Sequence, residues 1–147
     1  MRALLAVGLT LAICRFCYAD DHTDVVREYL RARTTTLRGN ATSESVDRVI
    51  AYYTSDVIYE DPAVHMRVEG ADQLRRGMLS HLNDYAGSER DTNILVESII
   101  SVGNAVAVKI AESFSVKADA GPKKIDRLRL NVIEFRDGKI CRIIDYH

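Results

Sequence analysis

The sequence is poor in the residues that define several classes of protein. It has 3 cysteines, 2 prolines and no tryptophan among 147 residues. Three cysteines are too few for a scaffold held by disulfides. The 20 lysines and arginines are balanced by 21 aspartates and glutamates, which gives a formal net charge of -1. Because there is no basic excess to neutralise a phosphate backbone, nucleic acid is not an expected partner.

The composition that remains is that of a globular domain. Hydrophobic residues make up 47% of the chain and charged residues 28%, which argues against a disordered chain, collagen or a coiled coil. At roughly 150 residues per domain, the length predicts one domain. We find no Gly-rich phosphate loop, no G-x-S-x-G element and no H-x-H, H-E-x-x-H or cysteine cluster, so we expect no cofactor and no metal.

Residues 1–19 have the pattern of a secretory signal peptide. Arg2 precedes an apolar stretch from Ala3 to Cys14, and a short region then ends at Ala19. This stretch is shorter than the roughly 20 apolar residues that cross a bilayer, although a membrane-anchoring helix remains the alternative. We therefore expect a periplasmic or secreted protein with a mature domain of residues 20–147 and no membrane attachment after cleavage. Cys141 would be its single thiol.

Helical periodicity dominates the first half of the mature chain. Apolar spacing predicts an amphipathic helix over 24–38 that ends near Gly39. Thr42 is expected to cap a second helix, whose apolar face is Val46, Val49, Ile50 and Tyr53. A short strand is predicted over 57–59, before Pro62. A third helix follows Gly70 and ends by Gly87, with one side formed by Leu74, Met78, His81, Leu82 and Tyr85.

The second half of the chain reads as strands. The predicted strands cover 94–102, 105–117, 126–136 and 139–146, and Gly103-Asn104 and Asp137-Gly138 are typical of two-residue hairpin loops. Helices followed by an antiparallel meander make an α+β fold.

The last hairpin predicts which residues face each other. If Asp137 and Gly138 form its loop, paired positions sum to 275. This pairs Phe135 with Ile140, Ile133 with Arg142, Asn131 with Ile144 and Leu130 with Asp145. Each sheet face then holds large apolar residues, so we expect one face to cover the helices and the other to form a homodimer. A monomer with scattered apolar surface is the alternative.

Three motifs connect this pattern to a known family. Glu60-Asp61-Pro62 is followed by seven residues and Gly70, Val25-Val26 stands three residues before Tyr29, and the meander closes with Phe135-Arg136-Asp137-Gly138. Over residues 24–147 the chain resembles the nuclear-transport-factor-2-like superfamily, in its SnoaL-like and ketosteroid-isomerase-like branch. The resemblance implies a cone-shaped half-barrel, in which a curved antiparallel sheet wraps around the N-terminal helices with a pocket between them.

The resemblance also implies three catalytic residues. The proton-shuttling aspartate of the steroid isomerases falls on Asp61, and their oxyanion-donating tyrosine falls on Tyr29. With a one-residue gap, their second, acidic oxyanion donor falls on Asn131, where an amide replaces the acid. Such a set can take a proton next to a carbonyl and stabilise the enolate oxygen. The alternatives are that Asp61 caps a turn, that Tyr29 is plain core, and that Asn131 bonds internally.

A pocket in this fold would be lined by aromatic, sulfur-containing and histidine side chains. The expected lining residues are Tyr53, Tyr59, His65, Met66, Met78, His81, Phe114, Ile133 and Phe135, although the same residues can form an ordinary core. Such a pocket suits a small hydrophobic molecule with one or two polar atoms. Two functions follow: an isomerase or cyclase-type enzyme that moves protons on a small hydrophobic carbonyl compound without a cofactor, or an exported binding protein for such a molecule.

Overall fold

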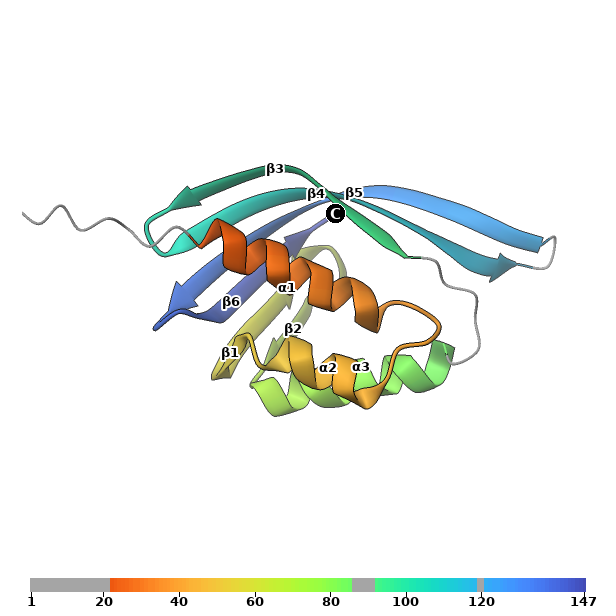
Figure 1. Cartoon of the computed structure of the whole chain (residues 1–147), viewed down its shortest axis with the longest axis horizontal. Helices are drawn as coiled ribbons and strands as arrows, with labels where there is room; N and C mark the ends of the chain where they lie inside the picture. The colour runs from red at the N-terminus through yellow and green to blue at the C-terminus, as the bar shows by residue number, and fades with distance from the viewer. Residues whose placement is uncertain (1–21, 86–91, 119–120) are drawn as a thin grey trace, which may run out of the picture.

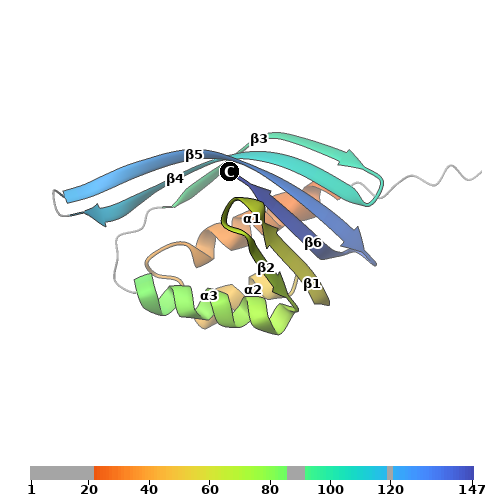
Figure 2. The same cartoon turned by 180° about the vertical axis from the view of Figure 1, so that it is seen from behind.

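Three helices pack on one side of a curved six-stranded sheet (Figures 1 and 2). The computed structural model describes residues 22–85, 92–118 and 121–147, so the predicted signal peptide at 1–19 lies outside the described residues. The elements are α1 (Thr23–Thr36), α2 (Ser43–Ile50), β1 (Tyr53–Asp61), the 3-10 turn η1 (Pro62–Val64), β2 (Met66–Glu69), α3 (Ala71–Tyr85), β3 (Asn93–Val102), β4 (Ala105–Ala118), β5 (Gly121–Arg136) and β6 (Lys139–Tyr146). None of the described helices is long and apolar enough to cross a membrane.

The predicted α+β cone is confirmed, with one correction to the sheet. The strand order is β2-β1-β6-β5-β4-β3, and β1 pairs with β6 in parallel, through Tyr59 and Ile143 among others. The prediction of an antiparallel sheet is therefore wrong at this pair. Hairpin rules concern neighbours in the chain, whereas β1 and β6 are joined only through α3 and the meander.

Local sequence explains the ends of the helices. Val26, Tyr29 and Leu30 form the buried stripe of α1, and at the end of this helix the hydroxyls of Thr34, Thr35 and Thr36 bond back to backbone carbonyls, an alternative to further helical bonds. The predicted cap of α2 is present as a capping box between Thr42 and Ser45.

Two boundaries differ from the prediction. The second helix ends at Ile50, and Tyr53 begins β1 instead of lying on that helix. The Tyr-Tyr-Thr sequence at 52–54 consists of aromatic and β-branched residues that favour strands. The strand predicted over 57–59 accordingly extends over Tyr53–Asp61, and the four-residue edge strand β2 was not predicted.

A β-bulge changes the register of the last hairpin. Asp137 and Gly138 form the predicted two-residue loop, with φ values of 53° and 74°, and Arg136 faces Lys139. The pairing then shifts between Glu134 and Phe135, because Cys141 and Arg142 together oppose Glu134. From there on paired positions sum to 276, so Ile133 faces Ile143, Asn131 faces Asp145 and Leu130 faces Tyr146. The predicted pairs of Ile133 with Arg142, Asn131 with Ile144 and Leu130 with Asp145 are wrong.

The shifted register decides which residues lie on each face of the sheet. The inner face carries the buried core residues, among them Ile133, Phe135, Ile140 and Ile143. The outer face is also apolar: a row across four strands contains Ile100, Ala107, Val132 and Ile144. Exposed large residues of this outer face include Ile100, Leu128, Leu130 and Tyr146.

Candidate functional site

A cavity of about 390 Å³ opens at one end of the cone. It lies between the C-terminal end of α1, the segment after it, α3, and strands β4 and β5. Part of its wall is apolar, from Leu37, Met78, Leu82 and Phe114. The rest is polar and charged, from Arg33, Thr36, Arg38, His81, Thr92, Glu112, Arg127 and Arg129. The apolar side chains are thus only part of the lining of a cavity that is also rich in arginine.

The predicted site residues divide into three groups. Met78, His81 and Phe114 line the cavity. Tyr53, Ile133 and Phe135 lie in the core, His65 and Met66 are exposed at the turn between β1 and β2, and Tyr59 belongs to an interior polar network. The predicted catalytic residues Tyr29, Asp61 and Asn131 are at least 95% buried and do not line the cavity.

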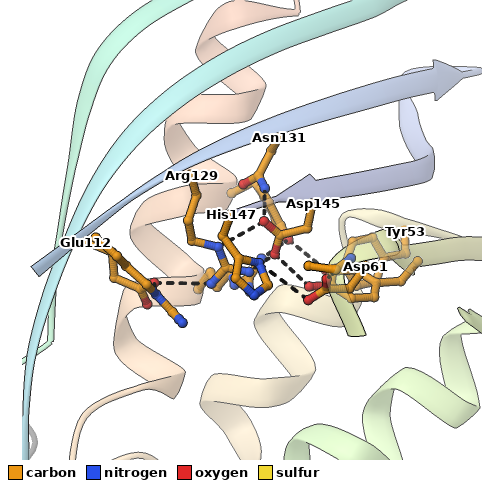
Figure 3. A network of polar contacts seen from close by, with 12 residues as sticks. Tyr53, Asp61, Glu112, Arg129, Asn131, Asp145 and His147 are labelled. Carbon is orange, nitrogen blue, oxygen red and sulfur yellow. Dashed lines mark hydrogen bonds and ion pairs between the residues drawn. The ribbon is translucent and has the colours of Figure 1, made fainter. Parts of the chain in front are cut away.

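Asp145 is the centre of the interior polar network (Figure 3). It has no exposed surface. Its Oδ1 accepts hydrogen bonds from Arg129 Nε at 2.9 Å and from Asn131 Nδ2 at 2.8 Å, and its Oδ2 accepts one from the Tyr59 hydroxyl at 2.7 Å. Arg129 Nη2 completes an ion pair with Oδ2. The bulge in β6 makes this network possible, because it places Asp145 opposite Asn131 on the inner face.

Arg129 joins this network to the cavity. Its Nη1 lies 3.1 Å from Glu112 Oε2, and Arg127 Nε lies 2.7 Å from the same oxygen. Burial alone would raise the pKa of the Glu112 carboxyl, but the hydrogen bonds and charges of the two arginines lower it overall. Because Glu112, Arg127 and Arg129 all line the cavity, one side of the ion network faces the cavity and the other side holds Asp145.

A pair of tyrosines lies beside this network, under Arg33. The hydroxyls of Tyr29 and Tyr53 are 2.9 Å apart and buried, and Arg33 Nη1 is 3.5 Å from the Tyr29 hydroxyl. Burial, reinforced by the neighbouring Tyr29, raises the pKa of Tyr53 well above its usual value. Tyr53 therefore stays protonated at neutral pH and acts as a hydrogen-bond donor or acceptor, not as a charge.

Asp61 points inward but is engaged locally. Its side chain is 5% exposed, its Oδ1 accepts a hydrogen bond from the Ala63 amide at 3.2 Å, and its Oδ2 lies 3.6 Å from His147 Nδ1. The carboxylate thus caps η1, as expected for an aspartate before proline, and also faces the interior.

Sequence reasoning missed Arg33, Glu112, Arg129 and Asp145. A signal existed, because Glu112, Arg129 and Asp145 interrupt apolar strands with charge. For Asp145 this signal depended on the bulge, because the unshifted register placed Asp145 on the other face of the sheet. In the described parts of the chain, no group of three or more histidine, cysteine or acidic residues is arranged to hold a metal ion.

Comparison with solved structures shows a shared fold at low sequence identity. An LEH-like epoxide hydrolase from M. tuberculosis superimposes with a TM-score of 0.59 at 20% identity, over 81% of this chain and 79% of that one. The epoxide hydrolase/cyclase-like enzyme SalBIII of salinomycin formation gives 0.61 at 21%, over 84% and 87%. A protein of ketosteroid isomerase-like fold from Catenulispora acidiphila gives 0.59 at 15%, over 82% and 85%.

Comparison of the sequence with protein families gives a match over most of the chain. No curated protein matches the chain significantly. Residues 26–143, which include most of α1, the bulge of the last hairpin and all the cavity-lining residues named above, match the SnoaL-like domain. The chain therefore belongs to the SnoaL-like domain family.

Proposed function

We propose that this chain is an acid–base enzyme of the isomerase or cyclase type, acting on a small, largely hydrophobic substrate that enters through the cavity, with Asp145 as the proton acceptor. The structural neighbours named for epoxide hydrolysis and for pyran ring formation are consistent with such chemistry. The proposal rests on the geometry around Asn131 and Asp145.

An unpaired acceptor next to Asp145 carries the proposal. Asn131 is 1% exposed, and its amide nitrogen is used by Asp145, but its Oδ1 has no hydrogen-bond partner among the described residues. Buried acceptors nearly always have one, and leaving one unsatisfied costs about 1–3 kcal/mol. A hydroxyl that donates to this oxygen would lie beside the Asp145 carboxylate, because Asp145 Oδ1 is 2.8 Å from the nitrogen of the same amide, and a general base requires that proximity.

The network also has the charges that the other half of such a reaction needs. When a hydroxyl opens an epoxide, its proton passes to the base, its oxygen bonds to carbon, and the broken C–O bond leaves an alkoxide. Arg129 lines the cavity and would stabilise that alkoxide electrostatically until the proton returns to it. Buried ion pairs often stabilise a protein no more than apolar residues of similar volume in the same place. A chemical role therefore explains the presence of this network better than a role in stability.

Two asparagine substitutions test which carboxylate is the base. We expect Asp145→Asn to lower turnover by about 10²–10⁴-fold, the usual contribution of a general base, and Asp61→Asn to leave turnover within about fivefold. Activity is measured on epoxides, as diol or cyclic ether formation, and on enolisable ketones, as proton exchange in D₂O. Circular dichroism and substrate binding show that each variant is folded. If Asp61→Asn loses activity and Asp145→Asn keeps it, the resemblance-based assignment of Asp61 is correct and this proposal is wrong.

A second candidate function is binding without catalysis. It is favoured by the complete burial of Asp145 and the near-complete burial of Asp61, since neither carboxylate lines the cavity. Mass spectrometry of small molecules co-purified with the protein would identify a bound ligand. A ligand that binds and is never converted, together with no turnover on either substrate panel, would favour the binding protein over the enzyme.

We also propose that residues 1–19 direct export and are removed after Ala19. The mass of the protein recovered from the periplasm or the medium tests this. A mature chain beginning at Asp20 supports the proposal, and an exported chain that retains residues 1–19 contradicts it.

A further inference from the structure

The cavity wall carries more positive charge than its own carboxylates neutralise. Among the described lining residues, the charged groups are the guanidinium groups of Arg33, Arg38, Arg127 and Arg129 and the single carboxylate of Glu112. Glu112 is already shared by Arg127 and Arg129, and Arg129 also holds Asp145. These three ion pairs leave Arg33 and Arg38 outside the network.

Arg33 differs from Arg127 and Arg129 in its partners. It forms no ion pair with any described carboxylate, and its hydrogen bond is a long one of 3.5 Å to the Tyr29 hydroxyl. Burial alone would lower the pKa of Arg33, but the facing hydroxyls of Tyr29, Tyr59 and Tyr53 raise it overall, so it remains cationic. The charge of Arg33 also acts on Arg129. The pKa of Arg129 is lowered first by burial and then by the positive charge of Arg33.

The position of Arg33 on α1 does not offset the cost of burying a cation that has no counter-ion. It lies in the last turn of α1, where the helix dipole favours a cation by about 0.3–1 kcal/mol. A partly buried cation without a counter-ion costs more than that, because burial removes hydration that a hydroxyl at 3.5 Å replaces only in part. The guanidinium presents a planar fork of N–H donors, which matches a carboxylate in a bidentate arrangement.

The geometry points to an organic anion as the ligand of this cavity: a carboxylate that pairs with Arg33, attached to an apolar body that packs on Met78, Leu82 and Phe114. This inference deepens the proposed function, since it names the substrate class for the same cavity. The volume of about 390 Å³ lies within the range of small-molecule pockets. Apolar and cationic side chains line the same cavity, and the Arg127 guanidinium lies over the Phe114 ring at 5.1 Å, so one ligand can contact both kinds of group.

Two ligands of one shape and different charge test the inference. Calorimetry compares 4-phenylbutanoate with its neutral analogue 4-phenylbutanamide. In the unmodified protein we expect the carboxylate to bind about tenfold more tightly than the amide, a difference of about 1.4 kcal/mol. Added salt should weaken the binding of the carboxylate more than that of the amide. Equal affinities, or no measurable binding of either compound, would overturn the inference without any variant.

Arg33→Gln then assigns the preference to one residue. We expect it to abolish the preference for the carboxylate and to leave amide binding within about twofold. Arg31→Gln is the matched control, because Arg31 lies on the same helix, is exposed and does not line the cavity. Retention of the full preference in Arg33→Gln would contradict the assignment.

The two proposals fail in different ways. An Asp145→Asn variant that is inactive and still prefers the carboxylate supports both. A protein that prefers the carboxylate and turns over no substrate retains this inference while the proposed enzyme fails.

Discussion

Replacement of Asp145 by asparagine is the most informative perturbation of stability. The side chain has no exposed surface and takes hydrogen bonds from Arg129, Asn131 and Tyr59. Asparagine keeps the volume but removes the charge, and it turns an NH₂ group toward groups that are themselves donors. Removing one partner of a buried ion pair costs about 3–5 kcal/mol. Because Arg129 retains Glu112 as a partner, we expect the lower end, about 3 kcal/mol.

Urea unfolding followed by circular dichroism measures this loss. A stability of about 5–15 kcal/mol is usual for a domain, so a loss of about 3 kcal/mol leaves the variant folded and lowers its melting temperature by about 10 °C. An unchanged m-value shows that the transition is still comparable. Asp126→Asn is the control, because the Asp126 pair with Lys124 is 66% exposed on the aspartate side and should contribute less than 1 kcal/mol.

The double substitution separates pairing from packing. Arg129→Met alone leaves Asp145 as an unpaired buried charge, so it should cost as much as Asp145→Asn or more. The combined Arg129→Met and Asp145→Asn variant should cost less than the sum of the two single changes, because it removes both charges together. A loss below about 1 kcal/mol for Asp145→Asn, or strict additivity of the pair, would refute the buried ion pair on which the proposed site depends.

Three further predictions concern pH, the sheet face and backbone strain. The pKa of Glu112 is lower in the folded chain than in the unfolded chain. Its contribution to stability is therefore present above its unfolded pKa of about 4.3 and is lost as pH falls through the folded value. Glu112→Gln should make the free energy of unfolding depend less on pH below about pH 5. We expect a homodimer through the outer sheet face, and Leu130→Arg, on its exposed apolar surface, should give a monomer in analytical ultracentrifugation, whereas a monomeric parent protein would contradict this. Gly138→Ala should destabilise the chain by about 1 kcal/mol, because φ is 74° there, although a Cβ would meet no atom. Gly77→Ala, within α3, should stabilise the chain by a similar amount, because a Cβ has open space there and alanine favours a helix.

Local chemistry was sufficient to predict much of the fold. The helical spacing of Val25, Val26, Tyr29, Leu30 and Leu37 predicts α1, of which Val26, Tyr29 and Leu30 are buried. Thr42 marks the start of α2. Asp137 and Gly138 predict the last hairpin because they tolerate the positive φ angles that a two-residue loop requires. In each case the interactions involved lie within a few residues of one another, so the sequence contains the whole cause.

The arrangement of side chains in the interior of the cone could not be predicted from the sequence, because it depends on contacts between segments that are far apart in the chain. Asp145 faces inward only because one extra residue in β6 shifts the register, and either register would have placed apolar residues on both faces. Tyr59 reaches Asp145 only because β1 pairs in parallel with β6, 86 residues away along the chain. Arg33 meets the arginines of β5 because α1 crosses the concave side of the sheet (Figure 1). The sequence by itself therefore determined the helices, the turns and the class of fold. The tertiary structure decided which charged side chains share the interior, because a bulge and a long-range strand pairing are selected by packing over the whole sheet and not by any local pattern.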